Sequence, residues 1–161
     1  MNEEHFKDFR KSFEYFYPEN PQAVQLCMDL VYCSDKIDDS VDEGSINNQD
    51  SYQLFTKLLV DIPSNPVYQL IGHELRPILL NVMLNWQIAN DLETRKDKTD
   101  DDLNKCYMLR ASLYDIFSFL AYKLYGVEWF SRVGPDIKRL YGESLEEYKE
   151  EMSCQIHLQA E

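Results

Sequence analysis

The chain has 161 residues, of which 44% are hydrophobic and 28% charged, a composition typical of a globular domain and not of a disordered segment. Its 16 lysine and arginine residues stand against 29 aspartate and glutamate residues, giving a formal net charge of −13. Nucleic acid and anionic membranes repel such a chain, so direct nucleic-acid binding is excluded. Two functions remain compatible with this charge: imitation of nucleic acid and binding of cations.

The numbers of glycines and prolines and the spacing of the cysteines exclude further classes of protein. Five glycines and six prolines are too few for an all-β fold, and no apolar run approaches the ~20 residues that a membrane span needs. The acidic N-terminus lacks the apolar core of a secretory signal. No two of the cysteines have CxxC spacing, which argues against a zinc site of the finger or ribbon kind. Their scatter along the chain predicts reduced thiols and a cytoplasmic location.

Apolar residues recur at helical spacing from the first residues onward. Four phenylalanines at spacings of three and four predict a helix over residues 3–17, which Pro18 ends. Asn20 is the predicted N-cap of a second helix that runs to residue 43. Asp50 is the predicted N-cap of a shorter helix that ends near residue 60.

The middle of the chain predicts the centre of the fold. Asn65 repeats the start signal of Asn20, and Pro77 is expected to break or kink the helix that follows. Residues 78–93 are apolar on almost every side, which predicts a buried central helix. We therefore predict an all-α fold, with residues 1–161 forming one domain: a bundle of six to seven helices around the helix at about 78–93.

Two capping boxes mark helix starts in the last third of the chain. Thr99 and Asp102 have the spacing of one box, at the start of a helix predicted over residues 100–125. Ser144 and Glu147 have the spacing of another, at the start of the last, acidic helix.

Three aspartates of the second helix point to metal chemistry. Asp35, Asp38 and Asp42 fall on one helical face at positions i, i+3 and i+7, beside the apolar stripe. They repel each other and lie near a helix C-terminus, where the macrodipole disfavours negative charge. A bound Mg²⁺ would compensate both effects. A solvated acidic helix end is the alternative.

Residues 30–43, LVYCSDKIDDSVDE, resemble the first aspartate-rich helix of class I isoprenoid synthases, most closely the squalene/phytoene synthase branch with its DDxxDE core. The resemblance implies that these aspartates bind Mg²⁺, which holds a substrate diphosphate. Residues 90–94, NDLET, resemble the start of the second metal motif, ND(L/I)x(S/T)xxxE. Lys98 stands where that motif has its glutamate, and the chain is about half the usual length of the family.

A second stretch resembles the all-α NTP pyrophosphatases of the dUTPase and dCTPase types. Asp115, before an apolar run, matches the aspartate of their ExxD motif, and Ser112 stands in the glutamate position. Residues 38–42 match their EExxE or EExxD motif in charge and spacing. Both resemblances imply Mg²⁺ held by helix carboxylates with a diphosphate across it, and the dimers of this group leave a homodimer open.

From these patterns we predict Mg²⁺-dependent binding and cleavage of a diphosphate-bearing small molecule. The expected metal ligands are Asp35, Asp38 and Asp42. The expected catalytic groups, which would orient a water, are Asp39 and Asp115. The expected binding residues are Asn90 and Thr94, which would support the metal site, and Arg110, which would bind a phosphate. Arg110 could instead neutralise the aspartates as an ion pair, and Asp115 could be hydrogen-bonded to a buried tyrosine.

The acidic composition also supports a function without catalysis. A compact, acidic helical protein can occupy a basic groove on a partner protein, as inhibitors and nucleic-acid mimics do. This alternative predicts acidic residues spread over an outer face, whereas the enzyme predicts acidic residues that converge in a cleft.

Overall fold

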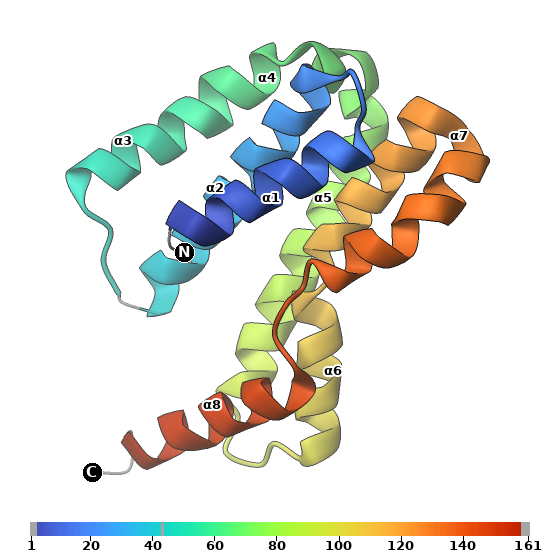
Figure 1. Ribbon diagram of the computed structural model, residues 1–161. Coiled ribbons are helices and arrows are strands. Elements are labelled where there is room, and N and C mark those ends of the chain that lie inside the picture. Colours follow the sequence, from blue (N-terminus) through green and yellow to red (C-terminus); the bar gives the residue numbers. More distant parts are fainter. Residues whose placement is uncertain (1–2, 43, 159–161) are drawn as a thin grey trace. The chain divides into compact units, whose positions relative to one another are not determined.

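The computed structural model describes residues 3–42 and 44–158, and the side chains of 8–41 and 44–152. All the regular structure within these ranges is helical, which confirms the all-α class (Figure 1). The helices are α1 (Glu3–Phe16), α2 (Pro21–Asp42), α3 (Asn48–Thr56), the π-helical segment η1 (Lys57–Asp61), α4 (Ile62–Ser64), α5 (Pro66–Glu93), α6 (Asp100–Arg110), α7 (Leu113–Arg139) and α8 (Leu145–Leu158). In the part of the chain that is described, none of them combines the length and apolarity of a membrane span.

The chain divides into two compact units, Met1–Leu75 and Arg76–Glu161, and the boundary falls within α5. The prediction of one domain over residues 1–161 stays a prediction.

Local side-chain caps begin the helices largely where the sequence predicts. Asn20 accepts a hydrogen bond from the backbone N–H of Ala23 at 3.0 Å, and Asn65 accepts one from Val67 at 2.9 Å. The prediction for Asp50 was wrong, because the cap of α3 is Asn47, which accepts from the backbone N–H of Asp50 at 2.9 Å. Asn47 has the extended backbone of an N-cap, and Asp50 lies inside the first turn, where the helix dipole favours its charge.

Both capping boxes are formed. Thr99 and Asp102 satisfy each other's backbone N–H groups at the start of α6, and Ser144 and Glu147 do the same before α8. The helix predicted over 100–125 is interrupted, however, since α6 ends at Arg110 and α7 begins at Leu113.

The core of residues 1–75 lies between α1 and α2. The predicted apolar face of α1 is confirmed for Phe9, Phe13 and Phe16, which are buried, and the rings of Phe9 and Phe13 lie 5.8 Å apart. Buried residues from α2 include Ala23, Leu26, Cys27, Met28, Leu30 and Val31.

Residues 76–161 contain two further groups of buried apolar side chains. One cluster joins α5, α6 and α8 through Ala89, Leu103, Cys106, Tyr148 and Met152. Other fully buried residues belong to α7: Ile116, Phe117, Leu120, Ala121, Val133 and Ile137. Gly126, with a φ of +84°, interrupts the helical backbone of α7.

The predicted central helix differs most from the structure. Helix α5 continues through Pro77, which removes one backbone hydrogen bond without ending the helix. Of residues 78–93, all of which are described, Ala89 alone is buried, whereas Leu80 and Met83 are exposed. Apolar residues on every side of a helix permit burial of any of its faces. Whether a face is buried depends on whether another helix of the fold packs against it.

Candidate functional site

The aspartates of α2 lie beside a lysine. The side chains of Asp35, Asp38 and Asp39 are half-buried, and that of Asp42 lies outside the described side chains. Lys36 Nζ contacts Asp39 Oδ2 at 2.9 Å, and this hydrogen bond raises the pKa of Lys36 above its ordinary value. Asp35 and Asp38 each take part in an interaction as well. Among the described residues, no three histidine, cysteine, aspartate or glutamate side chains are grouped as a metal-binding set.

Lys36 also links these aspartates to the next helix, because its Nζ lies 3.7 Å from Asp50 Oδ2 on α3. The acidic end of α2 is thus partly neutralised by its own neighbour. This leaves Asp39, one of the predicted catalytic groups, in an ion pair.

Another carboxylate on α2, which the sequence pattern did not single out, is more deeply buried. The side chain of Asp29 is 4% exposed, and it accepts from Lys57 Nζ at 2.6 Å and from Gln25 Nε2 at 2.9 Å. The signal was an acidic residue within the buried apolar run of residues 26–31. An aspartate in such a run needs a partner, because burial of an unpaired charge is costly.

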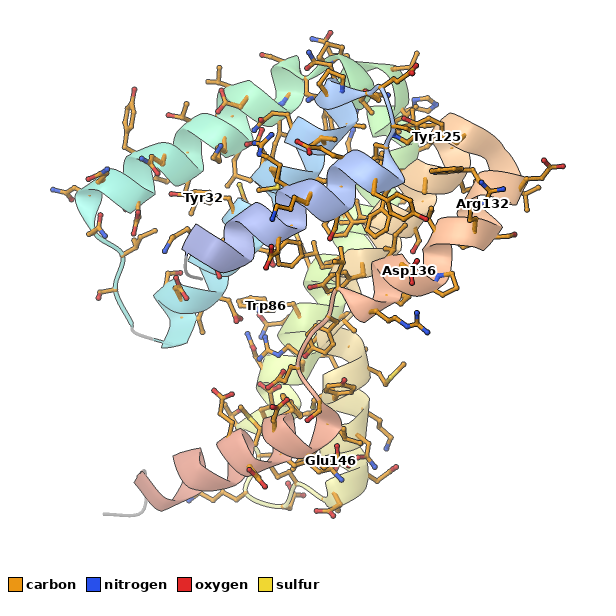
Figure 2. All side chains as sticks on the ribbon, viewed as in Figure 1. Tyr32, Trp86, Tyr125, Arg132, Asp136 and Glu146 are labelled. Carbon is orange, nitrogen blue, oxygen red and sulfur yellow. The ribbon has the colours of Figure 1, made fainter. Side chains whose placement is uncertain are left out.

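Lys57 is the first residue of η1, so the ion pair fixes η1 against α2. Its Nζ lies 5.3 Å from the centre of the Tyr32 ring, and the Tyr32 hydroxyl donates to Gln53 Oε1 on α3 at 2.7 Å. Figure 2 shows Tyr32 between α2 and α3. Together with the Lys36–Asp50 pair, these contacts hold one side of the α3–η1 segment against α2.

The opposite side of α3–η1 is apolar and exposed. We call this surface, formed by Tyr52, Phe55 and Leu59, the α3 face. Its side chains are 73%, 62% and 71% exposed, and their spacing of i, i+3 and i+7 places them on one side of the helix. Large apolar side chains gathered on one exposed face mark interaction surfaces more often than single exposed residues do.

In residues 76–161 a polar network surrounds Glu93, at the end of α5. Arg110 of α6 donates to its two carboxylate oxygens through Nε at 3.1 Å and Nη2 at 2.5 Å, and Tyr148 of α8 donates to it through its hydroxyl. The side chains of Glu93 and Arg110 are 10% and 18% exposed. Such a two-donor contact is the strongest geometry for an arginine–carboxylate pair.

Two of the predicted binding residues meet in this network. Arg110 Nη2 also donates to Asn90 Oδ1 at 2.6 Å, so Asn90 and Arg110 are brought together around Glu93. Thr94 lies at the end of the same helix, and its hydroxyl donates to the backbone oxygens of Asn90 and Asp91. No pattern in the sequence indicates Glu93 as the carboxylate that Arg110 binds.

Asp115, the other predicted catalytic group, is exposed at the start of α7. It forms an ion pair with Lys138 of the same helical segment. Asp115 therefore pairs with a lysine, where the sequence left a buried tyrosine open as its partner.

Tyrosines enclose the Glu93 network. The Tyr107 hydroxyl donates to the backbone oxygen of Glu143 at 2.7 Å, and the Tyr141 hydroxyl donates to its carboxylate at 3.1 Å. Burial raises the pKa of Tyr148 and of Glu143. Burial also raises the pKa of the Cys106 thiol, which makes it a poor nucleophile at neutral pH. These groups are therefore suited to hold helices together.

No protein-family model matches this chain, and neither a curated protein nor a solved structure matches it significantly. The resemblances to isoprenoid synthases and to NTP pyrophosphatases stay predictions.

Proposed function

We propose that this protein is a non-catalytic interaction protein that inserts the α3 face into an apolar groove bordered by basic residues on a partner protein. The observation that carries the proposal is the exposure of Tyr52, Phe55 and Leu59 on one side of a helix. Anchors at i, i+3 and i+7 are the pattern by which an amphipathic helix binds in a groove. Aromatic residues are also enriched among the residues that dominate binding energy.

Charge supports a basic partner. Residues 1–75 contain five lysine and arginine residues against fourteen aspartate and glutamate residues. A field of this sign speeds the approach of a basic surface and repels acidic ones. Residues 51–56, which include Tyr52 and Phe55, carry no charge, so the face itself loses little solvation of charged groups on binding.

The α3–η1 segment is also ordered before it binds. Lys57 is held by Asp29, and Gln53 is held by Tyr32, both on α2. A helix already fixed in its bound conformation avoids the entropy cost of ordering on binding. The polar contacts on one side therefore favour binding through the other side.

The test is affinity capture with the full chain as bait and substitutions on and off the face. We expect Phe55→Lys and Leu59→Lys to abolish capture of the partner. Tyr15→Lys is the matched control, because Tyr15 is an exposed aromatic residue of α1, and it should retain capture. A partner retained equally by Phe55→Lys and Tyr15→Lys would contradict the proposal.

The captured protein is then purified and titrated directly. We expect the affinity to fall as NaCl is raised from about 50 to 300 mM, because salt screens the attraction between an acidic and a basic surface. An acidic partner, or an affinity independent of salt, would contradict the electrostatic part of the proposal.

A magnesium-dependent enzyme acting on a diphosphate-bearing small molecule is the second candidate. It is supported by the three half-buried carboxylates of Asp35, Asp38 and Asp39, which lie within about one turn of α2. The test is the melting temperature with EDTA, with Mg²⁺, and with Mg²⁺ plus pyrophosphate, for the natural chain and for Asp38→Ala. A rise that grows with pyrophosphate and is lost in the variant supports the magnesium–diphosphate site that this enzyme needs, and equal melting in all conditions contradicts it.

A further inference from the structure

The second half of α5 carries an exposed apolar surface that the proposed function does not use. We call it the α5 stripe, and it consists of Leu80, Met83, Leu84 and Ile88. These side chains are 58%, 65%, 53% and 47% exposed, and their spacing places them on one side of the helix. No residue between Pro77 and Asn90 is charged.

The two ends of the stripe carry opposite charges. Arg76 lies one turn before Leu80, and Asp91 lies two turns after Leu84, so both flank the same side of α5. Both residues are exposed, and Asp91 accepts a hydrogen bond from Gln87 Nε2 at 2.9 Å. The stripe is therefore positive at its N-terminal end, negative at its C-terminal end and uncharged between them.

We propose that the α5 stripe pairs with the same stripe of a second copy of this chain, with the two helices antiparallel. An antiparallel pair centred between Met83 and Leu84 places Arg76 opposite the partner's Asp91 at each end. A parallel pair would place Arg76 opposite the partner's Arg76. A symmetric interface of this kind uses one patch twice and is closed, so it gives a dimer.

The net charge of −13 makes this pairing specific to the stripe. Two copies of an acidic chain repel each other over most of their surfaces. They do not repel each other across the α5 stripe, because the stripe is uncharged and its two ends carry opposite charges. One helix from each chain is a small interface, so we expect a dissociation constant on the order of 10 μM.

The first test is sedimentation equilibrium of the full chain across this concentration range. We expect a monomer–dimer equilibrium that Leu84→Lys weakens at least tenfold, because it places two lysines at the centre of the interface. Met108→Lys, on an exposed residue of α6, is the matched control and should leave the equilibrium unchanged. Circular dichroism shows that each variant keeps its helices.

The second test is charge reversal at low salt. Arg76→Asp and Asp91→Arg should each weaken the dimer, and the double variant should restore it, because every Arg again faces an Asp. A chain that is monomeric at all concentrations, a dimer insensitive to Leu84→Lys, or a double variant weaker than both single variants would overturn the proposal. Phe55→Lys should leave dimerisation unchanged, which separates this result from the test of the α3 face.

Discussion

Residues 1–75 and residues 76–161 each bury one carboxylate against one basic side chain, but the two ion pairs are built differently. Asp29 accepts one hydrogen bond from Lys57 and another from Gln25, and its pair with Lys57 joins α2 to η1. Glu93 receives two bonds from Arg110 and one from Tyr148, and it joins α5, α6 and α8.

The difference shows how each region supports its exposed apolar face. A lysine is a point charge on a flexible stem, and an arginine offers a rigid fork that fixes orientation. Lys57 therefore positions one short segment and leaves the α3 face outward, whereas Arg110 ties three helices at one end of α5. Substitutions at the two basic residues should reveal this contrast in stability.

The largest effect is expected from Arg110→Met. The substitution leaves the carboxylate of Glu93 buried with too few donors, so we expect the free energy of unfolding to fall by about 3–5 kcal/mol. Urea unfolding followed by circular dichroism measures it. Arg110→Lys keeps the positive charge but not the two-donor geometry, so its stability should lie between those of the natural chain and Arg110→Met. A loss below about 1 kcal/mol for Arg110→Met would contradict the role of Arg110 in joining the three helices.

A smaller loss, about 2–3 kcal/mol, is expected from Lys57→Met. Asp29 keeps the bond from Gln25, and the more exposed position of Lys57 lets water approach the carboxylate. Asp29→Asn in the same background should recover part of the loss, because it removes the unpaired charge, and a double-mutant cycle measures the recovery. A cycle without recovery would show that Lys57 acts by packing alone.

The helix caps extend the comparison to single hydrogen bonds. Thr99→Ala removes a reciprocal capping box in residues 76–161 and should cost about 1 kcal/mol. Asn47→Ala removes the cap of α3 and should cost about 0.5 kcal/mol, because the cap of α3 satisfies one backbone N–H whereas the capping box of α6 satisfies two. Thermal unfolding of both variants tests the order, and a larger loss for Asn47→Ala would reverse it.

The smallest effect depends on pH. Burial raises the pKa of Glu143 above its ordinary value, so the folded state binds this proton more tightly than the unfolded state, and stability falls as rising pH ionises the group. Glu143→Gln should therefore stabilise the protein at pH 7, by less than about 0.5 kcal/mol after solvent screening. The stability that Glu143→Gln adds should shrink as the pH falls toward 4. Melting curves of both proteins between pH 4 and 7 measure this difference, and a difference that grew at low pH would contradict the prediction.

The sequence predicted the features that depend on neighbouring residues. The caps at Asn20, Thr99 and Ser144 were predicted because each needs only a side chain and a backbone N–H three residues away. Likewise, the phenylalanines of α1 were placed on the buried face by their spacing alone.

Features that depend on distant pairing were not predictable. Asp29 and Lys57 are 28 residues apart, and Glu93 and Tyr148 are 55 apart, so no local pattern relates them. The exposure of α5 was missed for a related reason, since burial of a helix face depends on which other elements the fold places there. Arg110 was expected to bind an anion, and Glu93 is the anion that the structure supplies.

The most direct test of the account is the affinity of the purified partner for the natural chain, for Phe55→Lys and for Tyr15→Lys. We expect Phe55→Lys to weaken binding about thirtyfold or more, because it removes an interface anchor, and Tyr15→Lys to bind like the natural chain. Equal affinities for all three proteins would contradict the claim that the α3 face is the binding surface.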